Sequence, residues 1–137
     1  MMRFFTLLLC VSFFASANSQ TVIWGGPGDA NAEFDGGLND WTVNAVSPNE
    51  DALWIWEADG AADQGAYIGT RGPIASPSVA NGAMAFDSDF YDNAGEVGNF
   101  GNGLAASPQV GELISPVFSC EGYESVSFTW FQYTRQF

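Results

Sequence analysis

Short runs of β-favouring residues, separated by turn residues, make up most of the chain after residue 40. They predict strands at 41–46, 53–57, 66–69, 83–86 and 113–118. Strand side chains alternate between faces, so the 53–57 run places Trp54 and Trp56 on one face of its strand. Pro116 has no backbone N–H, which confines the 113–118 run to a sheet edge, a strand start or a bulge.

The clearest predicted strand lies near the end of the chain, at 124–133. Apolar residues at every second position from Val126 to Trp130 share one face, and hydroxyl side chains share the other. This pattern assigns Trp130 to the core. Phe131 and Tyr133 then fall on the hydroxyl face, so we expect the far end of this strand to be covered on both sides.

The remaining segments favour turns rather than helices. No segment shows helical periodicity over three turns, and residues 25–37 are rich in Gly, Asp and Asn, which predicts a loop. That loop lacks the lysine of a phosphate-binding P-loop, so we exclude a phosphate cradle. Spaced short strands with Gly and Asp turns predict an all-β fold, an antiparallel β-sandwich or barrel.

A secretory signal peptide is predicted at residues 1–17. Arg3 gives a positive start, an uncharged apolar run follows, and an Ala-x-Ala cleavage pattern ends at residue 17, with an alternative end at residue 19. The apolar run is too short to span a bilayer, which needs about 20 apolar residues. We therefore expect a chain that is secreted or held at the cell surface.

Removal of the signal leaves a Gly-rich segment at 18–33 and one domain at 34–137. Cys10 lies in the discarded run, so Cys120 is the one cysteine that remains. A lone cysteine in a secreted chain is a buried small hydrophobe, an unpaired thiol or half of a bond to an absent partner.

The charge of the chain excludes several partners. It has 16 acidic and 3 basic residues, a net charge of −13, and neither Lys nor His. Loss of Arg3 with the signal gives 2 − 16 = −14. Such a chain repels nucleic acid phosphates and anionic membranes, and it suits divalent cations or a salty environment.

Several motifs occur in the order found in one known family. They are FDGGLNDWTV at 34–43, the pair Trp54 and Trp56, GAMAFDS at 82–88, LISPVF at 113–118 and VSFTW at 126–130. Together they resemble the MAM-like jelly-roll modules, which include the cleaved-adhesin and choice-of-anchor domains of secreted Bacteroidetes proteins. The resemblance implies a two-sheet antiparallel jelly roll that binds glycans or proteins, as one module of a larger surface polypeptide. The family's domain continues for several strands past residue 133, so we expect the jelly roll to be truncated at its C-terminus.

The residue types present exclude most catalytic chemistry. Without His there is no Ser-His-Asp or Cys-His system, and without Lys there is no Schiff base. Paired carboxylates could cleave glycosides, but 16 acids make many accidental pairs and no site is visible. We therefore predict that the chain is not an enzyme.

The acidic run at 87–96 is the best local candidate for a metal site, because Ca²⁺ prefers clustered carboxylate and carbonyl oxygens. It is not an EF-hand loop, since Tyr91 stands where a ligand belongs. The alternative is a solvated acidic turn. The family resemblance implies a structural calcium held by Asp35 and Asp87.

Trp54 and Trp56 are the candidate ligand-binding residues, since an exposed indole can stack on a sugar ring. The alternative is packing in the core or between sheets. The leading hypothesis is an adhesion or binding module for an extracellular glycan or protein. The alternatives are a structural spacer in a larger exported protein and a non-catalytic accessory part or fragment of a secreted hydrolase. Exposed Trp would favour sugar, and a flat apolar patch would favour a protein partner or neighbouring module.

Overall fold

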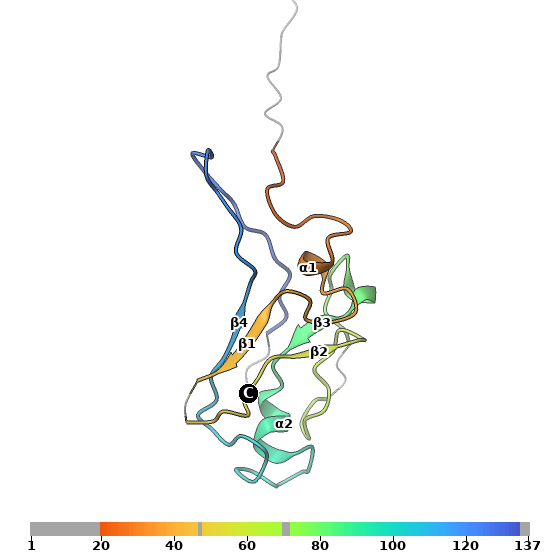
Figure 1. Ribbon diagram of the computed structural model, residues 1–137. Helices are drawn as coiled ribbons and strands as arrows, with labels where there is room; N and C mark the ends of the chain where they lie inside the picture. Colours follow the sequence, from red (N-terminus) through yellow and green to blue (C-terminus); the bar gives the residue numbers. More distant parts are fainter. Residues whose placement is uncertain (1–19, 47, 70–71, 135–137) are drawn as a thin grey trace, which may run out of the picture.

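The structure is a computed structural model that describes residues 20–46, 48–69 and 72–134. The predicted signal peptide therefore lies outside the described residues. The described elements are short and follow one another as α1 (Ala30–Glu33), β1 (Thr42–Ala45), β2 (Ile55–Glu57), the 3₁₀ helix η1 (Val79–Asn81), β3 (Ala83–Ala85), α2 (Ser88–Asn93) and β4 (Gly111–Ile114). Figure 1 shows these elements joined by long irregular connections.

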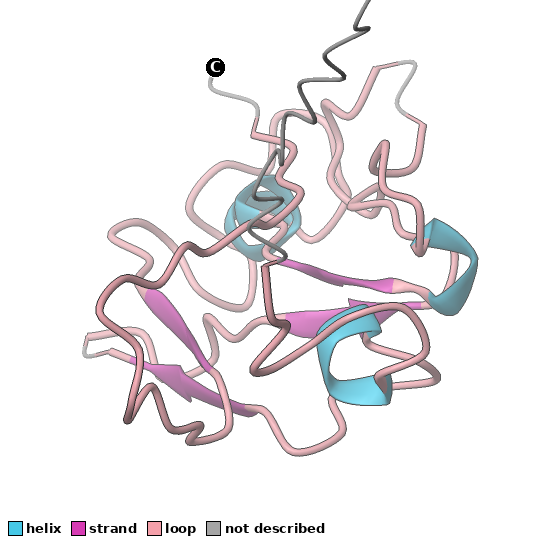
Figure 2. Cartoon of the chain, turned by 90° about the horizontal axis from the view of Figure 1, so that it is seen from above, coloured by secondary structure: helices cyan, strands magenta, loops and turns pink. Residues whose placement is uncertain are grey.

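Four strands form two antiparallel sheets of two strands each. β1 pairs with β4, so that Thr42 faces Ile114, and β2 pairs with β3, so that Ile55 faces Ala85. Figure 2 shows the two strand pairs as separate units, with loops making up most of the remaining chain. The chain is therefore β-rich and antiparallel, as predicted, and the finer arrangement as a β-sandwich stays a proposal.

The β1–β4 sheet shows how the sequence pattern determines pairing. Val43 faces Leu113 and both are half-buried, whereas Asn44 faces Glu112 and both are exposed. The Asn44 amide donates to the Glu112 carboxylate at 2.8 Å. Apolar residues thus meet on one face and polar residues on the other, which is the cross-strand pattern that stabilises a two-stranded ladder.

The β2–β3 sheet depends on a glycine. The 3₁₀ helix ends at Gly82, where φ is 97° and ψ is −175°, a region open essentially to glycine alone. A Cβ at this position would lie 2.5 Å from the Trp56 indole nitrogen. The turn at Asn81-Gly82 lets β3 approach the Trp56 side chain of β2.

The best sequence candidate for a strand is wrong: 124–133 carries no strand. Every residue from 121 to 134 is exposed, and Trp130, expected in the core, is 71% exposed. A strand forms only where a neighbour offers backbone donors and acceptors, and within the described part of the chain none pairs with this segment. The candidate strand at 66–69 is also wrong, since residues 66 and 67 form a turn and residues 68 and 69 have no regular structure.

The interior is small and lies beside α2. Ala52, Tyr91 and Ala105 are its buried members, with Phe86 and Phe90 packed against them. The Phe86 and Tyr91 rings meet edge to face at 5.4 Å, a favourable aromatic geometry. Across the described ranges, no helix is long and apolar enough to cross a membrane.

Candidate ligand-binding surface

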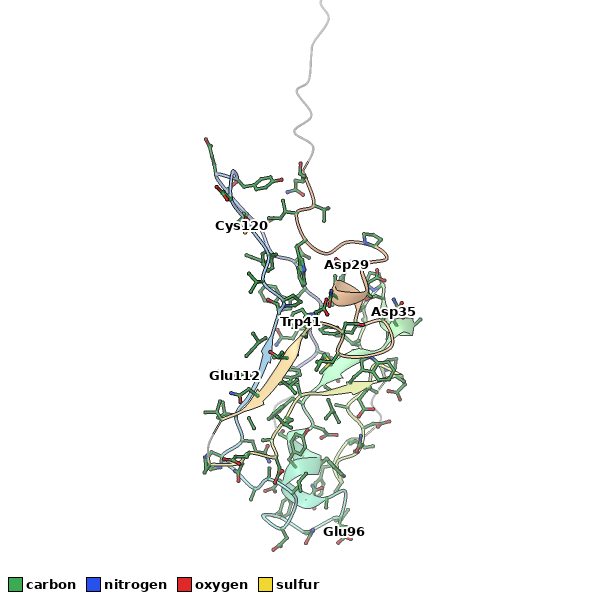
Figure 3. The ribbon with its side chains drawn as sticks, in the orientation of Figure 1. Asp29, Asp35, Trp41, Glu96, Glu112 and Cys120 are labelled. Carbon is green, nitrogen blue, oxygen red and sulfur yellow. The ribbon has the colours of Figure 1, made fainter. Side chains whose placement is uncertain are left out.

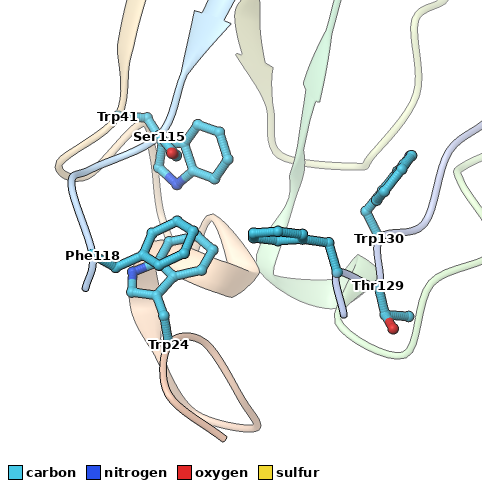
Figure 4. A pocket seen from close by; sticks show the side chains of 7 residues that line it. Trp24, Trp41, Ser115, Phe118, Thr129 and Trp130 are labelled. Carbon is cyan, nitrogen blue, oxygen red and sulfur yellow. The ribbon is translucent and has the colours of Figure 1, made fainter. Parts of the chain in front are cut away.

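Aromatic rings from distant parts of the chain gather at one end of the β1–β4 sheet. The Trp24 and Phe118 rings stack at 5.1 Å, Trp24 meets Trp41 at 5.8 Å, and Phe118 meets Phe128 at 5.7 Å. Figure 4 shows the Trp24 and Phe118 rings lying over one another. We call these four residues, with Trp130, the aromatic cluster.

The aromatic cluster lines an open cleft of about 440 Å³ together with Ser115 and Thr129. Trp41 is fixed in the cluster by its indole N–H, which donates to the Asn31 carbonyl at 2.7 Å. Asn31 belongs to the short helix α1, whose first turn is capped by the Asp29 side chain. The helix cap and the start of β1 therefore position one wall of the cleft (Figure 3).

Phe128, Thr129 and Trp130 also line the cleft. They belong to residues 124–134, which we call the C-terminal segment. Phe128 is 60% exposed, Trp130 71%, and Tyr133 62%. These values leave large apolar side chains in water, although burying such a side chain is worth about 1.5–3 kcal/mol. An exposed apolar surface rimmed by polar residues is typical of an interaction site.

A wider groove of about 960 Å³ extends from the cleft between the two sheets. Leu113 of β4 and Met84 of β3 both line it, as do Trp54, Phe86 and the C-terminal segment from Val126 onward. Each sheet therefore presents apolar side chains to the same groove.

The electrostatic setting is strongly negative. All 16 acidic residues belong to the described ranges, and Glu33, Asp87 and Asp89 line the groove itself. The three arginines lie outside the described ranges. With a net charge of −13 on the whole chain, the field around the groove favours cationic groups.

Trp54 and Trp56 are half-buried and already use their indole N–H groups. The Trp54 nitrogen donates to the Gly111 carbonyl at 3.0 Å, and the Trp56 nitrogen donates to the Phe34 carbonyl at 2.9 Å. Trp54 also packs on Phe86, with ring centroids 5.6 Å apart. These contacts fit the packing interpretation, and sugar binding by this pair stays a prediction.

Asp87 is a structural carboxylate that is only 4% exposed. It caps α2 by accepting from the Phe90 N–H at 3.1 Å, and its other oxygen accepts from the N–H groups of Gln64 and Gly65 at 3.0 and 3.2 Å. Asp89 in the same helix accepts from the Tyr67 N–H at 2.7 Å. The acidic run at 87–96 is therefore largely a capped helix held by backbone donors.

Asp35 and Asp87 are not brought together into a ligand set. Asp35 is exposed beyond the end of α1, as Figure 3 shows, whereas Asp87 is buried beside Gln64. Over residues 20–134, apart from the gaps, no three side chains of the metal-binding types gather. Ca²⁺ takes six to eight oxygen ligands, so this pair alone does not fit a calcium site, and calcium binding there stays a prediction.

Tyr91 is the one residue within the described part of the chain whose pKa is shifted. It is 3% exposed, and its hydroxyl donates to the Leu53 carbonyl. Burial raises the pKa of Tyr91 above 10.0, and the negative charges of Asp87 and Glu57 raise it further. The phenol is therefore a neutral donor at physiological pH and serves the fold.

None of the five members of the aromatic cluster was among the predicted ligand residues, Trp54 and Trp56. Trp24 lies in the segment assigned before the domain, and Phe118 ends the predicted run at 113–118. The apolar run Val22-Ile23-Trp24 just before the glycine loop is the signal that would have found Trp24. Cys120, shown in Figure 3, follows Phe118 closely as a half-buried free thiol.

The chain matches no protein-family model, no curated protein and no solved structure. Function is therefore inferred from the residues and geometry of this surface.

Proposed function

We propose that this chain is an exported binding module that takes a protein ligand on the aromatic cluster and the C-terminal segment. The observation that carries the proposal is the exposure of Phe128, Trp130, Phe131 and Tyr133 along one segment. Aromatic side chains are enriched at protein interfaces, where they supply large contact area at low entropic cost.

A protein ligand is supported over a glycan by the state of the indoles. A sugar-stacking Trp uses its ring face and keeps its N–H for a polar partner. The N–H groups of Trp54 and Trp56 are donated to backbone carbonyls, and that of Trp130 is donated to the Gln132 side chain at 3.1 Å. The exposed ring of Trp130 keeps a glycan as the second candidate.

Export and a non-enzymatic role are parts of the same proposal. The charge and apolar order of residues 1–17 support export. The absence of His and Lys from the sequence supports binding over nucleophilic catalysis. A spacer in a larger exported protein predicts no ligand at all, and an accessory part of a hydrolase predicts a glycan ligand.

Calcium stabilisation through Asp35 and Asp87 is an accessory proposal with its own test. A bound ion stabilises the fold by about 2.7 kcal/mol at a hundredfold excess over its dissociation constant. The thermal midpoint of the chain in millimolar Ca²⁺ would then exceed that in chelator. An unchanged midpoint rules this proposal out.

The ligand class is tested by screening the purified chain on a glycan array and on an array of extracellular proteins. We expect protein hits that the double substitution Phe128→Ala and Trp130→Ala removes. The matched control is Phe100→Ala with Leu104→Ala, two comparably exposed residues (61% and 63%) outside the C-terminal segment. Hits only on glycans, or protein hits that survive the first double substitution, would contradict the proposal.

A further inference from the structure

We infer that the C-terminal segment, whose backbone pairs with no described strand, accepts an extended peptide with alternating apolar and basic side chains. This inference rests on the proposed function, because it states how that surface would hold a protein ligand. Strand addition to an exposed edge is a recurring mode of peptide recognition, in which main-chain bonds give affinity and alternate side chains give specificity.

Side chains two positions apart meet along the end of the segment. The Trp130 indole donates to the Gln132 side chain at 3.1 Å, and the Gln132 amide donates to the Thr134 hydroxyl at 2.6 Å. Side chains two positions apart therefore share one face, as they do in an extended chain. Phe128 and Trp130, also two apart, both line the aromatic cleft, and Thr129 between them lines it as well.

The backbone of the segment is open to a partner. From residue 124 to 134, no N–H or carbonyl is bonded to another backbone group of the described chain. The chain reverses just before it, where the Tyr123 N–H donates to the Cys120 carbonyl at 3.3 Å and Gly122 has φ of 87°. Pro116, on the arm that leads into this turn, has no N–H to contribute to a ladder between the two arms.

The groove provides the place for the peptide's apolar face. It lies alongside the segment and is lined from both sheets, by Leu113 of β4 and by Met84 of β3. A peptide paired with the segment would direct every second side chain to one face, where the groove can receive them. Five or six paired residues would span about 17–20 Å, the usual length of a strand.

The negative charge of the chain favours basic side chains on the peptide. Glu33, Asp87 and Asp89 line the groove, and the whole chain carries −13. A second copy brings the same negative charge, so like-charge repulsion opposes self-pairing. A basic peptide is instead attracted to this surface and is steered toward it at low salt.

The test uses three synthetic nine-residue peptides with the full chain. The first alternates lysine and valine, the second has the same composition with the lysines and valines in two blocks, and the third is the first with alternate amides N-methylated along one edge. Binding is measured by fluorescence anisotropy, and amide hydrogen exchange locates the contact. We expect the alternating peptide to bind at least tenfold more tightly than the other two and to slow exchange within 124–134.

A pair of chain variants supports the same test. Thr129→Pro removes one backbone donor from the middle of the segment, whereas Thr129→Ala keeps it. Since Thr129 is exposed, near-ultraviolet circular dichroism is expected to show both variants folded. We expect Thr129→Pro to weaken binding of the alternating peptide at least tenfold relative to Thr129→Ala, which shortens the same side chain but keeps the backbone N–H.

Three results would overturn the inference. The N-methylated peptide could bind as well as its parent, Thr129→Pro could have no effect, or no peptide could bind. Each of these results would exclude strand addition. None of them would decide whether the ligand is a protein or a glycan, which the two arrays test separately. Self-association of the peptide-free chain in light scattering would instead show that a second copy occupies the segment.

Discussion

At the scale of single residues, Asp87 shows how a carboxylate that resembles a metal ligand in the sequence serves the backbone in the fold. Its two oxygens accept from three N–H groups, those of Gln64, Gly65 and Phe90. It therefore joins α2 to the loop that precedes η1. A charged acceptor of backbone N–H groups forms stronger hydrogen bonds than a neutral one.

Replacing Asp87 with alanine should destabilise the fold by about 2–4 kcal/mol, because a helix cap is lost and buried N–H groups lose their acceptor. The matched control is Asp29→Ala, since Asp29 caps α1 through one hydrogen bond in a more open place, and about 0.5–2 kcal/mol is expected there. Urea unfolding of both variants measures the difference. Equal losses would contradict the role assigned to Asp87.

Tyr91 makes stability fall at alkaline pH. Its folded pKa is raised above the ordinary 10.0 by burial and by the charges of Asp87 and Glu57. The contribution is fully present below pH 10 and is lost as pH rises through the folded pKa, because the unfolded phenol ionises first.

The measurement is urea unfolding at a series of pH values from 8 to 11. The Tyr91→Phe variant, which cannot ionise at this position, should lose less stability above pH 10 than the parent chain. Parallel curves for the two proteins over this range would count against a raised pKa for Tyr91.

At the scale of elements, the predicted runs that form strands are those that have a neighbouring strand to pair with. The runs at 41–46, 53–57, 83–86 and 113–118 contain or overlap β1, β2, β3 and β4 in turn. Alternation identifies the faces of a strand but not its partner, which is why 124–133 was wrong as a paired strand. The helices α1 and α2 were missed because four and six residues are too few for periodicity.

The glycine that ends η1 should resist substitution. Gly82→Ala would impose φ of 97° on a residue with a side chain and would push a methyl group against Trp56. We expect a loss of about 1–3 kcal/mol, the usual cost of a backbone held in a sparsely populated region.

The matched control is Gly72→Ala, where a Cβ would meet nothing within 4 Å. Thermal unfolding compares the two variants. A Gly82→Ala midpoint equal to that of the Gly72→Ala variant would show that the turn before β3 tolerates a side chain.

At the scale of the whole molecule, two small sheets line one groove, and the packed interior beside α2 is small. The alternation of the C-terminal segment predicted that Phe128 and Trp130 share a face opposite Thr129, whereas all three residues line the cleft. It could not predict their exposure, because burial depends on what the rest of the fold places over them. Trp54 and Trp56, chosen for their pairing in sequence, are instead held by carbonyls of Gly111 and Phe34.

Trp54 packs within the fold and Trp130 lies exposed, so we predict that their removal changes stability by very different amounts. Trp54→Ala removes a half-buried ring packed on Phe86 and should cost about 3 kcal/mol, the low end for loss of a large aromatic side chain. Trp130→Ala removes a ring that is 71% exposed and should change stability by less than about 0.5 kcal/mol. Chemical denaturation distinguishes them, and a large loss for Trp130→Ala would place that residue in a packed core.

The central claim is that the backbone of the C-terminal segment has no partner in the ligand-free chain and is open to a peptide. Amide hydrogen exchange of the ligand-free chain tests it most directly, since exchange reports the hydrogen bonding of each segment. We predict fast exchange for residues 124–134 and slower exchange for the amides of β4 that pair with β1. Protection of 124–134 equal to that of β4 would show that the segment already has a partner within the chain, and it would contradict the account.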